Sequence, residues 1–453
     1  MLQGIAWLFL LAGCGSETTP SGSERLASSQ TASPQMALQQ RLPVRPDVNV
    51  IVISFDALRA DALGVYGYSR PTSPRLDAFA AKSTLFERAY TVAPVTPTSF
   101  AAAFTGLLPH RVFHRWNLVH QDTLAVRFAA NGYATAAFIN NVQLTEERSF
   151  DIGFDVYELN KSLQDEETLE SSLAWLEQNR QHKLFAWIHF LDPHSPYVYR
   201  DSSAHLYDAD YEGAFETTTR GSFDTDDPLE IARIRDLYDG EVLYVDAIFG
   251  RLIDGLSEMG LLENSIIVVT SDHGEEFKEH GGFQHDRLTE EHVRIPLLLY
   301  HPDAPGSART EILVSNVDFY PTFLSLAGIP SDGVLDGRDW TRLTTEPDWV
   351  AGVSMTGGQE RWLSLRNGDH KLILTCMPEH SLTLYDLAAD PGELRDLQTE
   401  LPAVTKTLHR DLGVVMGGEP CSMMQAAVQG VSPTVGLSAE NIEALKALGY
   451  LGD

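Results

Sequence analysis

Two carboxylates and one imidazole stand directly after long, largely apolar runs of the sequence. Asp56 follows the run 50–55, and Asp272 and His273 follow the run 266–271. Carboxylate oxygens and an imidazole nitrogen are a sufficient ligand set for a divalent cation. Any one of these residues alone would more commonly cap a helix, so the metal-site interpretation depends on all three lying together.

A hydroxyl group at the start of a predicted helix is the candidate reacting group. Thr96 precedes Pro97, which suits a first helical position, and a run of small residues follows. The pattern therefore predicts Thr96 as the N-cap. Free backbone N–H groups and the positive end of the helix dipole favour an incoming tetrahedral anion there. The alternative is that Thr96 caps the helix and does nothing else.

Short β-branched runs alternating with helical stretches must position these groups. From Asn49 onward this alternation predicts an α/β fold, with a mostly parallel sheet covered by helices on both faces. Strands are predicted at 48–54, 134–139, 183–190, 266–270 and 296–300, and helices at 75–81, 99–105, 124–131, 168–178, 231–259 and 318–326. Ligands bind beyond the carboxyl ends of the strands in such a sheet. The polar residues that follow the strands should therefore face one crevice: Asp56, Asn140, Asp192, His194, Asp272 and His273.

The pattern changes after about Leu343, where shorter strands follow one another at 362–366, 371–375 and 383–386 without a long helix between them. This predicts a small antiparallel sheet packed on the main domain. A last helix is predicted at 439–448, with Ser438 as its N-cap. We accordingly predict a catalytic α/β domain at 47–343 and a C-terminal subdomain with a terminal helix at 344–453.

The segment 1–12 is almost wholly apolar, but it is too short to span a bilayer, which needs about 20 residues. It ends in Leu-Ala-Gly-Cys and resembles a bacterial lipoprotein signal at 1–14, which predicts lipidation of Cys14 and anchoring to a membrane of the cell envelope. No Lys or Arg precedes the apolar run, and an uncleaved or misassigned start is the alternative. Residues 15–46, rich in Ser, Thr, Gln and Pro, predict a flexible linker.

The composition restricts the partners. The chain carries 33 Lys plus Arg against 63 Asp plus Glu, a net charge of −30, which argues against a nucleic-acid partner. An anionic substrate therefore needs a local positive group, and a bound metal ion would supply one. Three cysteines are too few for a cysteine-based zinc cluster. Whether Cys376 and Cys421 pair is left open by their spacing, and nothing in the sequence indicates an oligomeric state.

Several separate motifs resemble the sulfatase family of the alkaline-phosphatase-like superfamily. They are NVIVISFDALRADALGVYGY at 49–68, TPTSFAAAFTGLLPHR at 96–111, SDHGE at 271–275, EHGG at 279–282 with His285, DFYPT at 318–322, LYDL at 384–387 and DPGE at 390–393. The resemblance covers nearly everything after residue 47. It implies a metal-dependent ester hydrolase acting on an anionic ester.

The resemblance also implies roles for individual residues. Asp56, Asp272 and His273 match the family's metal ligands, and Thr96 stands at the nucleophile position beside the metal. His194 and His285 match side chains that contact the ester anion or its leaving oxygen, although a turn histidine and a loop histidine are the plainer interpretations. Asn140 falls where sulfatases usually carry a substrate-binding Lys. Glu275 and His280 are interpreted as supports.

Three departures from the family pattern bear on the chemistry. Sulfatases convert a Cys or Ser at the nucleophile position to formylglycine, and Thr96 cannot form that aldehyde. Phe100 replaces the Arg that normally follows four residues later, and Thr98 replaces a Pro. His273 stands in place of an Asn, which favours Mn²⁺ or Zn²⁺ over Ca²⁺ as the single divalent cation, with Ca²⁺ still an alternative.

These departures favour hydrolysis of phosphate esters, diesters among them, over sulfate esters. A phosphorylated threonine can be attacked by water at phosphorus, whereas a sulfated threonine has no easy route of release. Three alternatives remain: a sulfatase without formylglycine, a phosphoryl-group transferase acting on lipid or glycan, and a non-catalytic surface binding protein. The substrate itself is not indicated, because the loop 199–227 gives no readable specificity.

Overall fold

The computed structural model describes residues 42–114, 116–162, 164–197, 225–304, 306–342, 349–355, 361–428 and 437–447. Cys14, the predicted signal and nearly all of the predicted linker lie outside these residues, as does most of the loop 199–227. Within the described ranges no helix combines the length and the apolar character that a bilayer crossing requires.

An eight-stranded sheet forms the centre of the molecule and confirms the predicted mostly parallel α/β fold. Its parallel core runs in the order β9, β1, β8, β6, β7, and an antiparallel β12 joins it to β2 and β13. The bounds are β1 Asn49–Phe55, β2 Thr84–Phe86, β6 Ala134–Ile139, β7 Val156–Leu159, β8 Leu184–Phe190, β9 Ser265–Ser271, β12 Leu297–Tyr300 and β13 Ala308–Thr310.

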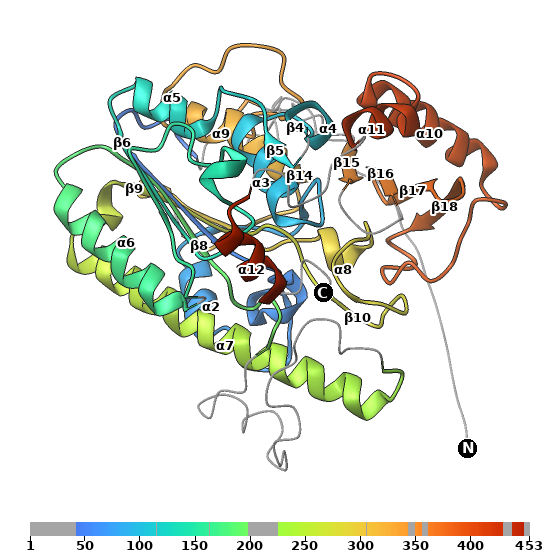
Figure 1. Ribbon diagram of the computed structural model, residues 1–453, viewed down its shortest axis with the longest axis horizontal. Helices are drawn as coiled ribbons and strands as arrows, with labels where there is room; N and C mark the ends of the chain where they lie inside the picture. The colour runs from blue at the N-terminus through green and yellow to red at the C-terminus, as the bar shows by residue number, and fades with distance from the viewer. Residues whose placement is uncertain are drawn as a thin grey trace, which may run out of the picture.

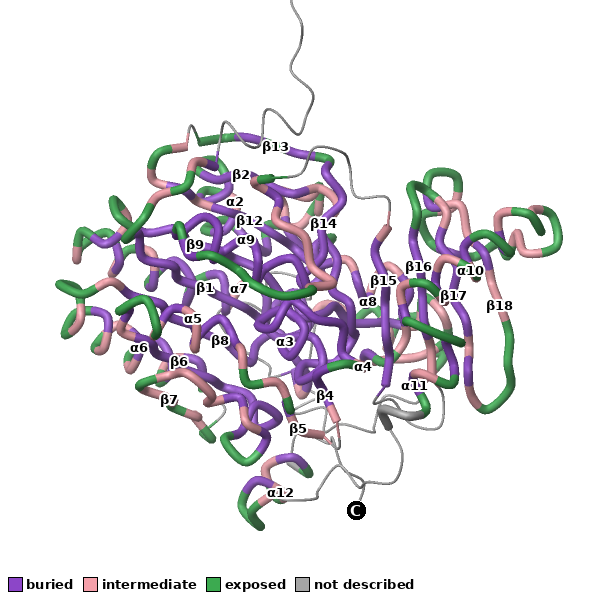
Figure 2. The backbone as a smooth tube through the Cα atoms, turned by 90° about the horizontal axis from the view of Figure 1, so that it is seen from above, coloured by how far each residue is buried: buried purple, intermediate pink, exposed green. Residues whose placement is uncertain are grey.

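Both faces of this sheet are buried, which explains why its central strands are apolar at successive positions. Val50 and Val52 of β1 belong to the core on one face, whereas Ile51 and Ile53 belong to the core on the other. Helices α3 (Thr96–Thr105), α5 (Leu124–Ala130) and α9 (Phe319–Leu326) cover the first face. Helices α2 (Pro74–Ala80), α6 (Asp165–Asn179) and α7 (Pro228–Glu258) cover the second (Figures 1 and 2). The ends of β1, β8 and β9 are thereby held in a rigid frame.

A four-stranded antiparallel sheet follows, as predicted. It consists of β15 (Trp349–Ser354), β16 (Arg361–Asn367), β17 (His370–Met377) and β18 (Ser381–Asp386). The sequence pattern does not predict β15, nor the helices α10 (Pro402–Met416) and α11 (Pro420–Val428). Leu408 and Leu412 of α10 share one apolar core with Leu363 of β16 and Leu372 of β17, so α10 covers this small sheet (Figure 1).

Buried ion pairs join the small sheet to the main domain. The ammonium group of Lys371 lies 3.0 Å from a carboxylate oxygen of Glu290 and 3.0 Å from one of Glu393. The guanidinium group of Arg366 lies 3.5 Å from Glu290. Burial raises the pKa of the Glu393 carboxyl to about 7. These contacts fix α8 (Glu290–Val293), which lies in the main domain, against β16 and β17.

The helix α12 (Ala439–Ala447) returns from the far end of the sequence to the main domain. Ser438 is its N-cap as predicted, because its hydroxyl oxygen accepts a hydrogen bond from the Asn441 amide. Leu445, 1% exposed, packs with Val142 and Leu191, which lie just after β6 and β8. The helix therefore supports the two segments that follow these strands.

The structure pairs Cys376 with Cys421, which settles the pairing that the spacing leaves open. The bond ties β17 to α11 across a sequence separation of 45 residues. Replacing both cysteines by serine should lower the free energy of unfolding by about 4 kcal/mol in a chain-entropy treatment of a loop of that length. Denaturant titration of the variant and of the wild type measures the difference. Reduction of the wild type should reproduce it, and identical midpoints for the oxidised and reduced wild type would contradict the prediction.

Candidate active site

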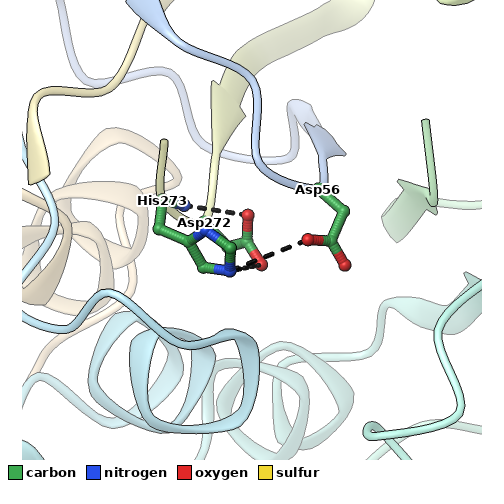
Figure 3. A group of neighbouring side chains, drawn as sticks. All are labelled: Asp56, Asp272 and His273. Carbon is green, nitrogen blue, oxygen red and sulfur yellow. Dashed lines mark hydrogen bonds and ion pairs between the residues drawn. The ribbon is translucent and has the colours of Figure 1, made fainter. Parts of the chain in front are cut away.

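Asp56 and Asp272 lie side by side because β1 and β9 are paired in parallel and end at the same edge of the sheet. Both carboxylates are buried. Asp272 Oδ1 accepts hydrogen bonds from the Ala57 amide at 3.1 Å and from the His273 amide at 2.8 Å. Its Oδ2 has no hydrogen-bond partner among the described residues and lies 3.4 Å from His273 Nε2. Figure 3 shows the three side chains of Asp56, Asp272 and His273 pointing toward one another.

The hydrogen bond of His273 fixes its tautomer. Its Nδ1 lies 2.9 Å from the carbonyl oxygen of Gly274, which can only accept, so Nδ1 carries the proton. Its Nε2 lies 3.4 Å from Asp272 Oδ2 and 3.7 Å from Asp56 Oδ1. A cation between these three buried atoms would satisfy the ring nitrogen and both carboxylates. The donor set therefore fits a divalent cation that accepts both nitrogen and oxygen ligands.

Thr96 joins this group, but not as the predicted N-cap. Helix α3 begins at Thr96 and Val95 is the N-cap, so Pro97 occupies the second helical position. The Thr98 hydroxyl donates to the Val95 carbonyl oxygen at 3.0 Å. The Thr96 hydroxyl oxygen instead lies 3.3 Å from His273 Nε2 and 3.5 Å from Asp56 Oδ2. The interpretation that Thr96 serves only as a cap does not fit this geometry.

Polar and aromatic contacts fix α3 against the segment that carries Asp272 and His273. The Ser99 hydroxyl donates to the Asp272 carbonyl oxygen at 2.8 Å and accepts from the Asn316 amide at 2.9 Å. The Phe100 ring packs on Trp187 and His189, with centroid distances of 4.6 and 5.0 Å. An aromatic cluster thus occupies the position from which the Arg of the family pattern is missing.

Two further histidines, His285 and His194, extend the site from the ring of His273. The ring centroid of His285 lies 4.1 Å from that of His273, and the ring of His194 lies 5.1 Å from that of His285. His285 Nδ1 lies 3.6 Å from Glu275 Oε1, and the Tyr197 hydroxyl donates to Glu275 Oε2 at 3.1 Å. The structure therefore places His285 beside His273, and His194 beside His285. Glu275 orients His285.

Asn140 lies at the predicted strand end, but its side chain turns away from Asp56. Its amide donates to Asp165 Oδ1 at 2.6 Å, and Asp165 also accepts from the Leu191 amide at 2.9 Å. The next residue, Asn141, donates its side-chain amide to Asp56 Oδ2. Successive side chains leaving a strand point in opposite directions, so a shift of one residue exchanges the two roles. The amide in the site is that of Asn141.

His189 is a further member of the site that the sequence pattern does not predict. Its Nε2 lies 3.6 Å from Asp56 Oδ2, and its Nδ1 lies 3.0 Å from the Ser54 hydroxyl. Burial lowers the pKa of His189 to about 4, so the ring is neutral at neutral pH. The available signal is a lone histidine in the otherwise apolar strand LFAWIHF.

Comparisons with known proteins agree on one family. The model of the sulfatase family matches residues 48–329, which include every residue placed at the site, and a model of the C-terminal part of N-sulphoglucosamine sulphohydrolase matches residues 278–416. Arylsulfatase K of Rattus norvegicus is 26% identical over 455 residues, covering 83% of this chain and 79% of the relative.

Two solved structures share the fold. The phosphonate monoester hydrolase of Agrobacterium radiobacter superposes with a TM-score of 0.72 at 20% identity and covers 82% of this chain and 95% of its own. A structure in complex with its substrate D-glucosamine-2-N,6-O-disulfate superposes with a TM-score of 0.70 at 20% identity, with coverages of 84% and 98%.

Proposed function

Because this chain belongs to the sulfatase family of ester hydrolases, we propose that it cleaves phosphate esters, diesters among them, or related anionic esters through unmodified Thr96. The observation that carries this proposal is the Thr96 hydroxyl, 3.3 Å from His273 Nε2 and 3.5 Å from Asp56 Oδ2. A secondary alcohol at this position cannot become formylglycine. In this proposal its hydroxyl oxygen acts as the nucleophile itself.

The residues of the site divide the work of ester cleavage between them. A divalent cation held by Asp56, Asp272 and His273 would supply a Lewis acid beside the Thr96 oxygen and the ester anion. The Thr96 hydroxyl gives its proton to Asp56 Oδ2, 3.5 Å away, as Oγ1 forms a bond to phosphorus and the bond from phosphorus to the leaving oxygen breaks. His285 or His194 donates the proton that this oxygen takes up. Water then attacks phosphorus and returns a proton to that histidine, while the bond from phosphorus to Thr96 Oγ1 breaks and Oγ1 takes its proton back from Asp56.

Release of the product argues for phosphorus rather than sulfur as the central atom. A formylglycine hydrate expels sulfate through its second hydroxyl, and Thr96 has none. The covalent adduct of Thr96 must be resolved at the central atom, and phosphorus accepts this attack when a cation and histidine donors spread the charge. The likeness to a phosphonate monoester hydrolase supports this proposal.

Hydrolysis of a sulfate ester is the second candidate function, because arylsulfatase K is among the relatives and a disulfated sugar is bound in one similar structure. The aromatic packing of Phe100 on Trp187 and His189 speaks against it, since it leaves this helix without the arginine of the family pattern. A transferase and a non-catalytic binding protein have no such observation in their favour.

A substrate panel with one shared aryl leaving group tests the proposal. The four substrates are a phosphate monoester, a phosphate diester, a phosphonate monoester and a sulfate ester. We expect the best phosphorus ester to exceed the sulfate in kcat/KM by at least about tenfold, or about 1.4 kcal/mol in transition-state stabilisation. Mass spectrometry of the peptide containing Thr96 should find the unmodified residue. A preference for the aryl sulfate would instead establish the second candidate.

A further inference from the structure

A second group of side chains that could bind a metal lies against the active-site loop, which is the segment 272–275 between β9 and β10. Glu276 of β10 (Glu276–Phe277) and Glu291 and His292 of α8 offer ligand atoms that all lie within 4.8 Å of one another. The loop is pressed against them, because the Gly274 amide donates to the His292 carbonyl oxygen at 2.8 Å. A Cβ at Gly274 would meet the Glu291 carbonyl oxygen at 2.0 Å, so this approach requires glycine.

Hydrogen bonds again fix the tautomer of the histidine. The Thr289 hydroxyl lies 2.6 Å from Glu291 Oε1 and 2.8 Å from His292 Nδ1. The hydroxyl has a single proton, and the carboxylate can only accept it, so the Thr289 oxygen accepts from Nδ1–H of His292. His292 Nε2 lies 3.6 Å from Glu276 Oε2, beyond hydrogen-bond distance. His292 is 1% exposed, and a cation between the ring nitrogen and the carboxylate would satisfy both buried groups.

Backbone amides contact the carboxylate of Glu276, and a second histidine contacts that of Glu291. Glu276 Oε1 accepts from the His280 amide at 2.8 Å and from the Gly282 amide at 2.7 Å, which directs Oε2 toward His292. The nearest guanidinium nitrogen, on the partly exposed Arg287, lies 3.9 Å from Glu276 Oε2. The His280 ring nitrogen Nε2 lies 3.2 Å from Glu291 Oε1.

The buried lysine and arginine nearby do not neutralise this group. Lys371 and Arg366 contact Glu290, the residue before Glu291. A pocket of about 320 Å³, lined in part by Arg59, Glu290 and Glu291, opens onto the Glu291 side of the group. It gives a hydrated ion a route from the surface.

We propose that Glu276, Glu291 and His292 form a second divalent-cation site, distinct from the site of Asp56, Asp272 and His273. Two carboxylates and a neutral imidazole with its other nitrogen hydrogen-bonded are the donor set of the first site repeated, so the ion belongs to the class of Mn²⁺ and Zn²⁺. Glu276 lies three residues after His273. The second ion would join the active-site loop to α8 and so position the ligands of the first.

Metal stoichiometry of the full chain separates this site from the first. The protein is stripped with chelator, dialysed against Mn²⁺ or Zn²⁺ alone, and analysed by elemental mass spectrometry. We expect two equivalents in the wild type, one in Asp272→Asn, one in His292→Gln and none in the double variant. An ion-paired cluster without a cation predicts one, none, one and none. That result, or a double variant that keeps the equivalent found in Asp272→Asn, would overturn the proposal.

The Asp272→Asn protein allows a second readout that leaves Glu276, Glu291 and His292 intact. Mn²⁺ should raise its melting temperature, and Co²⁺ should give visible absorption bands typical of a nitrogen ligand; both signals should vanish on adding His292→Gln. Glu279→Gln in the otherwise wild-type chain is the matched control. Glu279 lies on the same hairpin as Glu276, but its carboxylate contacts Arg59 rather than His292. This variant should bind two equivalents of metal. The His292→Gln protein measures metal binding at the first site alone. A failure of the second-site proposal therefore leaves the proposed function open to its own test.

Discussion

Replacing Thr96 with alanine should lower kcat/KM on the best phosphorus ester by at least about 150-fold, which corresponds to about 3 kcal/mol of lost transition-state stabilisation. The reason is geometric: the Thr96 hydroxyl is the nucleophile candidate that lies within 3.5 Å of both His273 Nε2 and Asp56 Oδ2. Alanine keeps the helix α3 and removes the oxygen. Steady-state kinetics, with circular dichroism to establish folding, measure the effect.

Two neighbouring substitutions make this result specific. Thr96→Ser keeps a hydroxyl and should retain part of the activity. Thr98→Ala removes the neighbouring hydroxyl, which donates to the Val95 carbonyl oxygen at the start of the same helix, and should stay close to the wild type. An undiminished Thr96→Ala enzyme would show that the nucleophile is another group, and the proposal of a threonine adduct would have to be abandoned.

Asp272→Asn should remove the cation of the active site and the activity together. Asparagine retains a carbonyl oxygen for the Ala57 and His273 amides but loses the charge, and it presents no second oxygen to His273 Nε2. Loss of groups that only support ligands typically lowers metal affinity or activity 10- to 100-fold, and we expect loss of a direct ligand to cost at least about 100-fold. Metal analysis and kinetics on the same preparation test whether the two losses coincide.

Asp165→Asn is the matched control for this experiment. Asp165 is likewise a buried carboxylate at this edge of the sheet, but it accepts from Asn140 and from the Leu191 amide instead of facing His273. Its replacement should leave metal content unchanged. Full occupancy of the active site in a variant with alanine at Asp56, Asp272 and His273 would refute the assignment of the ligands.

The strands of the parallel sheet were the most predictable part of the fold, and with them the positions of Asp56, Asp272 and His273. Strands buried on both faces are continuous apolar runs, so their ends are visible in the sequence. The helix α10 and the strand β15 are not visible in this way, because α10 is buried by the small sheet and β15 by its neighbours in that sheet.

Two kinds of detail could not be predicted from the sequence. One is the exact residue at which a helix begins or a side chain enters the site, and the other is contact between segments that are distant in the sequence. Thr96 lies one position inside its helix, since propensity locates a helix end only to within a residue or two. Asn140 and Asn141 exchange roles for the same reason. The contact of His189 with Asp56 joins β8 to the end of the neighbouring strand β1, and the contact of His292 with Glu276 joins α8 to β10. The partners are distant in the sequence, so no local pattern encodes these contacts.

The packing of α12 has a consequence for folding during synthesis. The hydrogen bond from Asn441 to Glu147 joins residues 294 positions apart, and Leu445 closes over Val142 and Leu191 beside it. On the ribosome, the segments after β6 and β8 emerge long before the helix that supports them. The apolar side chains of Val142 and Leu191 stay uncovered until residues 439–447 have been synthesised. The segments that carry Asn141 and His194 thus reach their final support only after translation has passed the whole catalytic domain.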